Sequence, residues 1–361
     1  MLAAPAPLLL TSDGGMTSRI RDKILLMLHT LLSLLLCALI SYAQTKKIIV
    51  KGADPATLKE FQSVSPKARV IGVTTETVMQ EIGDADTFIG VITPAEVRAG
   101  KNLKWVAVMS AGVENVLMKS GGNDLRDSNI VLTNNRVVQG PELADHAFAM
   151  LLTLTRDLPR YWGDKQHETW NSGNLRVIEL MGKNALIIGM GGAGMQIATR
   201  AWAFGMNVTG VDPEDKPFSP MIKRIVKPDQ LNEVMPDADV VFISAPDTPL
   251  SHKMVGPTQF ELMKKNSYFI AVSRGGVYDL PSLIKALDEN KLAGAGVDVV
   301  DPEPLPAGSA MWKFPNAIVT PHIAGRSDKD RGRMVGTIKE NIARFVDGKP
   351  LINVVDKQKG Y

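Results

Sequence analysis

From residue 47 onward, short apolar runs alternate with longer segments that have helical spacing. The apolar runs are four to ten residues long and rich in Val and Ile, and four of them predict strands at 47–52, 68–73, 87–91 and 103–112. Between them, "PATLKEFQSV" (55–64) and "TETVMQEIG" (75–83) are typical of helices. This alternation of strand and helix indicates a parallel sheet with helices on both faces.

A long helix and a second alternating unit follow. "PELADHAFAMLLTLTRDL" (141–158) carries an apolar stripe and has Pro141 at its start, where a missing N–H is tolerated. Six further strands are predicted at 184–190, 207–212, 239–246, 267–273, 293–300 and 317–323. These runs are almost continuously apolar, which is typical of a doubly wound sheet buried on both sides. A final helix is expected over 328–348.

Charge and cysteine content exclude several classes of protein. The chain has 361 residues, with 41 Lys and Arg against 38 Asp and Glu, and it contains no run of five like charges. We therefore expect no broad nucleic-acid surface. Cys37 is the single cysteine, which rules out an intrachain disulfide. No spacing of His, Asp and Glu predicts a metal site.

The first 45 residues differ from the rest. Basic residues between 19 and 23 precede an apolar run over 24–40, and Ser41, Tyr42 and Ala43 follow it. This order is typical of a secretory signal cleaved after Ala43, which predicts an exported or periplasmic protein. The run is at the short limit for a membrane span, so an uncleaved anchor is the second interpretation. In that case only this segment would contact the membrane. A cytoplasmic protein with an unimportant extension is the third.

"GMGGAG" (189–194) fits the pattern G-x-G-x-x-G with Gly189, Gly191 and Gly194. It follows a predicted strand and opens a helix, which is the context that a dinucleotide-binding loop requires. Glycines there permit a tight turn and a close approach of backbone N–H groups to a pyrophosphate. Asp212 ends the next strand, 18 residues beyond Gly194, and a carboxylate at that place accepts hydrogen bonds from ribose hydroxyls. It would repel a 2′-phosphate, so the sequence favours NAD over NADP.

Four residues with useful chemistry follow predicted strands of the second unit. Arg274 comes after the strand at 267–273, Asp298 and Glu303 lie at the end of the next, and His322 stands in "VTPHIAG" at the end of the last. The carboxyl ends of parallel strands meet at one edge, where ligands bind in open α/β folds. Histidine can both donate and accept a proton near neutral pH, and arginine pairs with a carboxylate through two hydrogen bonds.

The ordered set GMGGAG, VDP, SRGG, GVDVVDPEP and TPHIAG, with "VMSAGVENV" (108–116) upstream, resembles the D-isomer-specific 2-hydroxyacid dehydrogenase family. The resemblance spans residues 47–355. Within the family, the chain is similar to glyoxylate and hydroxypyruvate reductases. It implies a Rossmann NAD-binding domain over 146–322, inserted into a flavodoxin-like substrate domain made of 47–140 and 325–355. Residues 1–45 precede both domains. The site would lie in the cleft between them.

The resemblance also implies roles for residues. Arg274 would hold the substrate's carboxylate with backbone groups near Ala111 and Gly112, Glu303 would hydrogen-bond His322, and His322 would be the general acid and base. Asp298 would contact the nicotinamide carboxamide. The resemblance implies the following full set of residues in contact with the cofactor: Gly189, Gly191, Gly192, Ala193, Gly194, Asp212, Ala245, Pro246, Ser273, Asp298 and Gly325.

Some positions depart from the family pattern. Gly192 and Ala193 stand where the family often carries Arg and Ile, so a side-chain contact to the pyrophosphate is lost. Ala245 stands where a hydroxyl residue is common. Neither change removes a group expected to take part in the chemistry.

The leading interpretation is an NAD-dependent oxidoreductase that transfers a hydride between nicotinamide and C2 of a small 2-oxoacid or 2-hydroxyacid. A formate dehydrogenase is an alternative, although its family carries Gln where Glu303 stands. A non-catalytic NAD(H) sensor of the same superfamily is another, and a membrane-anchored structural protein is a fourth. By resemblance the protein would be a homodimer, with the apolar helix 141–158 at or near the interface.

Overall fold

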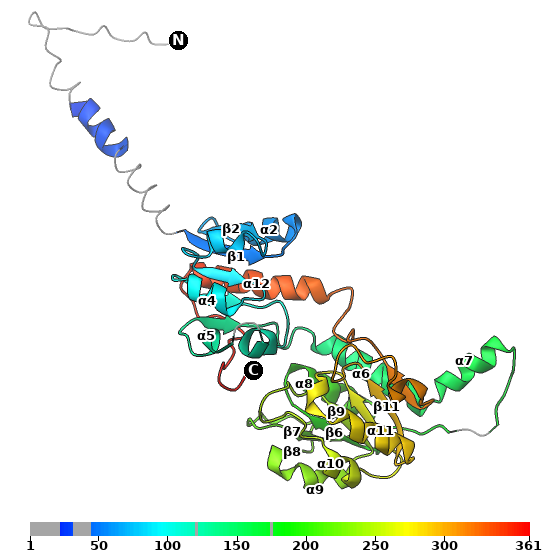
Figure 1. Cartoon of the computed structure of the whole chain (residues 1–361). Coiled ribbons are helices and arrows are strands. Elements are labelled where there is room, and N and C mark those ends of the chain that lie inside the picture. Colours follow the sequence, from blue (N-terminus) through cyan, green and yellow to red (C-terminus); the bar gives the residue numbers. More distant parts are fainter. Residues whose placement is uncertain (1–21, 32–44, 120–121, 174–175) are drawn as a thin grey trace, which may run out of the picture.

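The computed structural model describes residues 22–31, 45–119, 122–173 and 176–361. Figure 1 shows two α/β domains side by side, each built on one sheet. Every strand pair within both sheets is parallel, and helices cover the sheet faces. This confirms the predicted fold class of two doubly wound parallel-sheet domains.

The smaller sheet has the strand order β2-β1-β3-β4-β5. Its strands are β1 (Lys46–Lys51), β2 (Ala68–Val73), β3 (Thr87–Ile89), β4 (Trp105–Ala107) and β5 (Val131–Thr133). This order is the flavodoxin-like one. Its helices are α2 (Pro55–Gln62), α3 (Val78–Glu81), α4 (Pro94–Ala99), a π-helix (Asn115–Lys119) and α5 (Gly122–Arg126).

A helix from the far end of the chain completes the smaller domain. In α12 (Asp330–Val346), Val335, Ile338 and Ile342 are buried in the same cluster as Ile48 of β1. The Phe345 ring lies 5.4 Å from the Trp105 ring. The smaller domain is therefore discontinuous in the sequence.

The larger sheet has the order β12-β11-β10-β9-β6-β7-β8. Its strands are β6 (Asn184–Ile188), β7 (Asn207–Val211), β8 (Arg224–Val226), β9 (Val240–Ile243), β10 (Ser267–Ala271), β11 (Leu292–Val297) and β12 (Ala317–Val319). Strands β6 to β11 follow the Rossmann order. The direction of chain progression reverses between β6 and β9, and in such folds a crevice lies at this switch point. Its main helices are α6 (Gly140–Thr155), α8 (Gly192–Ala203), α9 (Leu231–Val234), α10 (Pro257–Leu262) and α11 (Leu280–Asp288).

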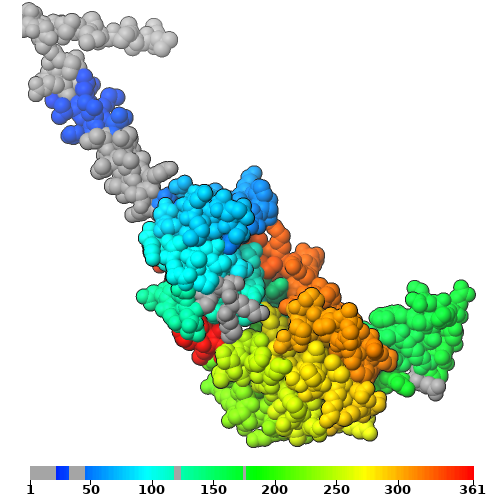
Figure 2. All heavy atoms as spheres, in the orientation of Figure 1, coloured from blue at the N-terminus to red at the C-terminus, as the bar shows by residue number. Residues whose placement is uncertain are grey.

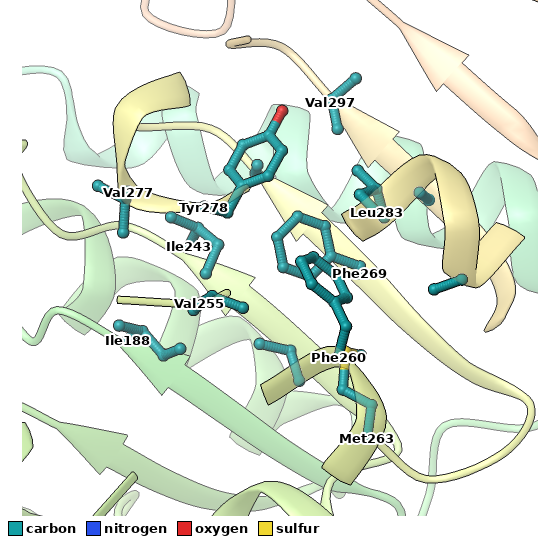
Figure 3. Close-up of a cluster of buried hydrophobic side chains, with 14 of the residues drawn as sticks. Ile188, Ile243, Val255, Phe260, Met263, Phe269, Val277, Tyr278, Leu283 and Val297 are labelled. Carbon is teal, nitrogen blue, oxygen red and sulfur yellow. The ribbon is translucent and has the colours of Figure 1, made fainter. Parts of the chain in front are cut away.

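Alternate residues of the central strands serve opposite faces of the larger sheet. In β9 and β10, Val241 and Phe269 face one buried cluster, whereas Phe242 and Ile270 face the other. Figure 3 shows the first cluster, in which Phe260, Phe269 and Tyr278 pack close to one another. Burial on both faces explains why these strands are almost wholly apolar.

The apolar stripe of α6 packs onto its own chain. Met150 and Leu154 lie directly over Gly296 and Gly294 of β11, where a Cβ would come within 2.8 Å and 3.2 Å of their side-chain atoms. The glycines of "AGAG" thus let the helix approach the sheet. Intrachain packing buries this stripe, and the expectation that the helix lies at or near a subunit interface stays a prediction.

The helix expected over 141–158 corresponds to α6, which ends at Thr155, three residues earlier than expected. Asp157 adopts a left-handed conformation, with φ 55°, and α7 (Leu158–Gln166) begins after it with Pro159 in its first turn. No residue of α7 is buried, and Figure 1 shows this helix projecting from the cofactor domain.

The N-terminal predictions lie mainly outside the described residues. Residues 1–21 and 32–44, which include Cys37 and Ala43, are not among them. Residues 22–31 form a helix whose apolar side chains are exposed. Within the ranges that the structure describes, no helix is long and apolar enough to cross a membrane.

Candidate active site between the two domains

The glycine loop joins β6 to α8. Gly189 has φ 95°, and a Cβ there would lie 2.5 Å from the backbone of Ala245. A Cβ on Gly194 would lie 1.9 Å from the Gly189 carbonyl oxygen. Gly191 precedes α8 and has no other atom near its Cβ position, so the space before the helix N-terminus is open. That open space and the helix dipole fit a pyrophosphate.

Gly192 has a packing reason to lack a side chain. A Cβ at this position would lie 2.4 Å from the Cα of Val137, in the segment that leads into α6. Gly140 of the same segment lies against the Gly192 carbonyl, where a Cβ would come within 2.8 Å of the oxygen. An arginine at 192, as in much of the family, would therefore collide with this segment. Ala193 is the next residue of α8 and is half-buried.

Asp212 is buried at the end of β7 and supports the glycine loop. Its Oδ2 accepts a hydrogen bond from the Met190 N–H at 2.8 Å, and its Oδ1 accepts one from the Glu214 N–H at 2.9 Å. Lys216 Nζ lies 3.0 Å from Oδ1. The carboxylate therefore stands beside the glycine loop, as the sequence predicts, and also forms an ion pair that the sequence analysis missed.

The remaining predicted cofactor residues are distributed around the crevice. Ala245 lies beside Gly189, and the Pro246 carbonyl accepts a hydrogen bond from Ser251. Gly325 accepts a hydrogen bond from Gln139 at 2.9 Å. The Oγ of Ser273 is buried and has no partner among the described residues. An unpartnered buried hydroxyl fits a site that a polar ligand completes.

His322 and Glu303 are brought together at the carboxyl edge of the larger sheet. His322 Nδ1 lies 2.8 Å from Glu303 Oε2, and the other carboxylate oxygen accepts from the Val300 N–H at 3.1 Å. The His322 side chain is 45% exposed. His322 has φ 55°, an uncommon conformation that surrounding contacts must hold, and such strain is concentrated at functional sites.

Asp298 holds the His322 loop in place. Its carboxylate accepts hydrogen bonds from the N–H groups of Ile323 (2.9 Å) and Ala324 (2.8 Å) and from the Thr320 hydroxyl (2.6 Å). The Asp298 side chain is 0% exposed, and its predicted contact with the nicotinamide carboxamide stays a prediction.

His146 is a second residue of this network that the sequence analysis missed. Its Nε2 lies 2.9 Å from the Thr320 hydroxyl and 3.7 Å from Asp298 Oδ1. It comes from α6, in the long segment between the two sheets. Its place on the long helix favours a packing or interface role, and no sequence signal points to Thr320 as its neighbour.

Arg274 lies between the two domains. Its Nε donates to Glu114 Oε1 at 2.7 Å, and its NH1 donates to the Ser273 carbonyl at 2.7 Å. Its guanidinium rests against Gly112, where a Cβ would come within 1.9 Å of NH2. Glu114 lies within the "VMSAGVENV" stretch, but the sequence analysis did not identify it as a site residue.

The loop around Ala111 and Gly112 presents backbone donors. The carbonyls of Ala111 and Gly112 accept hydrogen bonds from Asn134 at 2.6 Å and Ser110 at 2.7 Å. Within the part of the chain that the structure describes, the N–H groups of Ala111 and Gly112 donate to no protein acceptor. These amides lie beside Arg274, and together they provide donors for an anionic group.

Close packing connects the Arg274 loop to the His322 pair. Gly275 follows Arg274 and lies against Val300, where a Cβ would come within 2.0 Å of the carbonyl carbon. Val300 in turn donates to Glu303. The buried Tyr278 hydroxyl donates to the Val299 carbonyl at 2.7 Å, and burial raises the pKa of Tyr278, which keeps it a donor. The cation and the histidine therefore belong to one rigid assembly.

The fold and this arrangement define a class of protein. A dinucleotide loop, a histidine paired with a carboxylate, and an arginine opposite a loop of free amides are the parts of a nicotinamide-dependent oxidoreductase that acts on a small anionic substrate. The crevice lies at the topological switch point of the larger sheet, where such cofactors bind.

Comparison with known proteins identifies the family. Residues 148–324 match the model of the D-isomer-specific 2-hydroxyacid dehydrogenase NAD-binding domain. Glyoxylate reductase of Korarchaeum cryptofilum is 30% identical over 78% of this chain and 86% of its own length. D-3-phosphoglycerate dehydrogenase of Methanocaldococcus jannaschii is 29% identical over 86% of this chain, which spans 59% of that enzyme.

A solved structure agrees with both domains. A D-isomer-specific 2-hydroxyacid dehydrogenase family protein from Aeromonas salmonicida matches 87% of this chain and 99% of its own, with TM-score 0.72 and 28% identity. The chain belongs to the D-isomer-specific 2-hydroxyacid dehydrogenase family, and its larger domain is the NAD-binding domain.

Proposed function

We propose that the protein reduces a small 2-oxoacid to the D-2-hydroxyacid, and catalyses the reverse reaction, with His322 as the proton donor and acceptor. The hydrogen-bonded pair of His322 and Glu303, joined through Val300 to the Arg274 loop, is the observation that carries this proposal. When bound, NADH supplies the hydride that reaches C2.

Each residue has a physical reason for its role. Arg274 and the amides of Ala111 and Gly112 bind the substrate carboxylate and fix its orientation. His322 donates its proton to the carbonyl oxygen as the hydride arrives at carbon, so no alkoxide charge accumulates. Glu303 holds the ring in place through its hydrogen bond to Nδ1.

The buried carboxylate of Asp212 supports a preference for NAD over NADP, because a 2′-phosphate beside it would meet like charge. Lys216 partly offsets that charge. Comparison of kcat/KM for NADH and NADPH measures the preference, and an equal or higher value for NADPH would contradict it.

For the substrate, the names of the relatives support a short oxoacid. One is a glyoxylate reductase, and another is a glycerate dehydrogenase from Methylorubrum extorquens. We therefore propose glyoxylate and hydroxypyruvate as the first compounds to assay.

The decisive experiment is a steady-state assay of the purified protein with NADH and a panel of 2-oxoacids. His322→Ala should lose about 10²–10⁴-fold in kcat, the usual value of a general acid. Arg274→Ala should chiefly raise KM for the oxoacid. His252→Ala is a matched control, since His252 pairs with Asp247 outside this network. Wild-type rates in the first two variants would refute the site.

The same assay separates the other candidate functions. An NAD(H) sensor would bind NADH and reduce none of the oxoacids. A formate dehydrogenase would oxidise formate. That reaction neither adds a proton to a substrate oxygen nor removes one, so it would not need the His322 and Glu303 pair. The intact pair therefore favours hydroxyacid chemistry.

We also propose that the protein is a homodimer that pairs through α7 and the residues after it. Trp162 is 58% exposed and Trp170 is 100% exposed. Apolar side chains presented on a projecting helix are typical of a subunit interface. Burial of these tryptophans against a second copy would remove them from water.

For location, we propose that residues 1–43 direct export and are removed, with a retained membrane anchor as the alternative. The charged, apolar and small-residue order supports this. N-terminal sequencing of the protein from fractionated cells tests it. An intact N-terminus on a cytoplasmic protein would contradict export.

A further inference from the structure

The last residues of the chain are anchored on the smaller domain. Val355 donates to the Leu132 carbonyl at 2.9 Å, which places it against β5. Lys357 Nζ donates to three backbone carbonyls, those of Leu125 at 2.9 Å, Ser128 at 2.5 Å and Ile130 at 2.8 Å. These bonds hold the start of the segment 355–361, here called the tail, on the substrate domain.

The tail then closes into a tight turn. The Gly360 N–H donates to the Asp356 carbonyl at 2.8 Å, and the Asp356 N–H donates to the Tyr361 carbonyl at 3.0 Å. Asp356 Oδ1 also accepts from the N–H groups of Gln358 and Lys359. This turn is held by its own hydrogen bonds, so it presents Lys359 and Tyr361 in a defined geometry.

Those two side chains contact the cofactor domain. Lys359 Nζ lies 2.6 Å from Glu214 Oε1, and the Tyr361 hydroxyl lies 3.1 Å from the same oxygen. Gly360 lies against the methyl group of Thr248, where a Cβ would come within 3.6 Å of it. In Figure 2 the red atoms of the tail lie at the junction of the two domains.

This place is the adenosine end of the dinucleotide crevice. Glu214 lies two residues beyond Asp212, which accepts the ribose hydroxyls in this fold. Thr248 follows β9, on the other side of β6 from β7. The carboxyl ends of β7 and β9 thus flank the glycine loop, and the tail touches the segment after each of them.

We propose that Tyr361 and Lys359, supplied by the substrate domain, form the outer wall of the adenosine subsite. The wall contacts the adenine nucleoside half of the cofactor and leaves the nicotinamide half untouched. The proposal rests on dinucleotide binding, which the proposed function shares.

The contacts favour a tail that lines the adenosine subsite over a tail that acts as a plug, which would occupy the subsite and exclude the cofactor. The tail's polar atoms bind Glu214, while Asp212 pairs with Lys216 and, among the described residues, accepts no hydrogen bond from the tail. The space beside Gly191 is also open. The hydrogen bonds from Lys359 and Tyr361 hold the pKa of Glu214 below its ordinary value, so this attachment is charged at neutral pH.

The test is calorimetric titration of the full chain with ADP-ribose, which carries adenosine and the pyrophosphate but no nicotinamide base, and with nicotinamide mononucleotide, which carries no adenosine. Tyr361→Ala should weaken ADP-ribose binding about tenfold or more, because a stacked base contributes about 1–3 kcal/mol. Tyr361→Phe keeps the ring and should weaken it at most threefold. Lys359→Met should weaken it severalfold, and Lys349→Met is the matched control. The affinity for nicotinamide mononucleotide should be unchanged in all four variants.

The outcomes are distinguishable. Unchanged affinity of Tyr361→Ala for ADP-ribose would overturn the wall, and tighter binding would show that the tail is a plug. Equal weakening for nicotinamide mononucleotide would indicate general damage and would also overturn it. Failure of the wild type to bind ADP-ribose would refute the cofactor assignment itself, and with it the proposed function.

Discussion

Arg274 and Glu114 show how a single residue can depend on a partner far away in the chain. The two are 160 positions apart and belong to different domains, yet Nε and Oε1 lie 2.7 Å apart. With Nε and NH1 occupied, the guanidinium plane is fixed and its other N–H groups remain for a substrate carboxylate. Glu114 therefore acts as a positioning residue for Arg274.

Variants of Glu114 test that role. Glu114→Ala should raise KM for the oxoacid about tenfold, because a hydrogen bond to a charged group contributes about 1.5–3 kcal/mol and the guanidinium loses its fixed orientation. The kcat should change less than twofold. Glu114→Gln keeps an acceptor for Nε and is the control, with KM near that of the wild type. A fall in kcat without a change in KM would contradict a positioning role.

At the scale of elements, most strands were predictable from their apolar runs, and two short edge strands were not. The strand predicted at 68–73 coincides with β2, and the others overlap their predicted ranges. The sequence analysis missed β5 and β8, which have three residues each and lie at sheet edges. Three residues show no period, and only their pairing with a neighbour makes them strands.

Helix α4 was also missed, although its sequence carries a signal. Thr93 and Glu96 form a reciprocal capping box, in which Thr93 Oγ1 accepts from the Glu96 N–H and Glu96 Oε2 accepts from the Thr93 N–H. The "TPAE" sequence is typical of such a helix start. Attention to caps, in addition to apolar spacing, would have found it.

The cap of α11 allows a pH prediction. Asp279 accepts from the Ser282 N–H and hydroxyl, and hydrogen bonding to Ser282 is the main cause that lowers the pKa of Asp279. A carboxyl whose pKa is lower in the folded state stabilises the fold above its unfolded pKa, and this stabilisation is lost as pH falls. Asp279→Ala should cost about 1 kcal/mol at pH 7.

Urea denaturation at several pH values measures this effect. The difference between wild type and Asp279→Ala should shrink as pH falls below the unfolded pKa of 3.8. Asp279→Asn keeps a capping acceptor and should cost less than Asp279→Ala at pH 7. A difference that is constant from pH 7 to pH 3 would show that the carboxylate charge contributes nothing.

At the scale of the whole molecule, few contacts join the two domains, and each has a distinct place. Arg333 of α12 pairs with Glu142 of α6 at 2.5 Å, close to the connecting segments. Arg274 meets Glu114 in the crevice, and the tail meets Glu214 at its outer end. Polar contacts of this kind suit domains that move as rigid bodies and close over ligands.

The proposed dimer is tested at this scale. Trp162→Glu combined with Trp170→Glu should yield monomers by light scattering after size-exclusion chromatography, because two charges would be buried at the interface. Phe218→Ser changes an exposed aromatic residue elsewhere on the cofactor domain and is the control. A dimer that persists in the double variant at micromolar concentration would place the interface elsewhere.

The sequence by itself determined the fold class, and it predicted the glycine loop and the set of Arg274, Glu303 and His322. Continuous or alternating apolar runs and a glycine motif are local signals that can be read from the sequence. Parallel strands then bring the residues at their carboxyl ends to one edge of the sheet. Only the tertiary structure decided that Asp298 holds the loop of His322, that His146 joins the network behind His322, and that Glu114 contacts Arg274. These three contacts join residues that are 22, 174 and 160 positions apart, respectively. They depend on how the helices and domains pack. No local pattern records such packing.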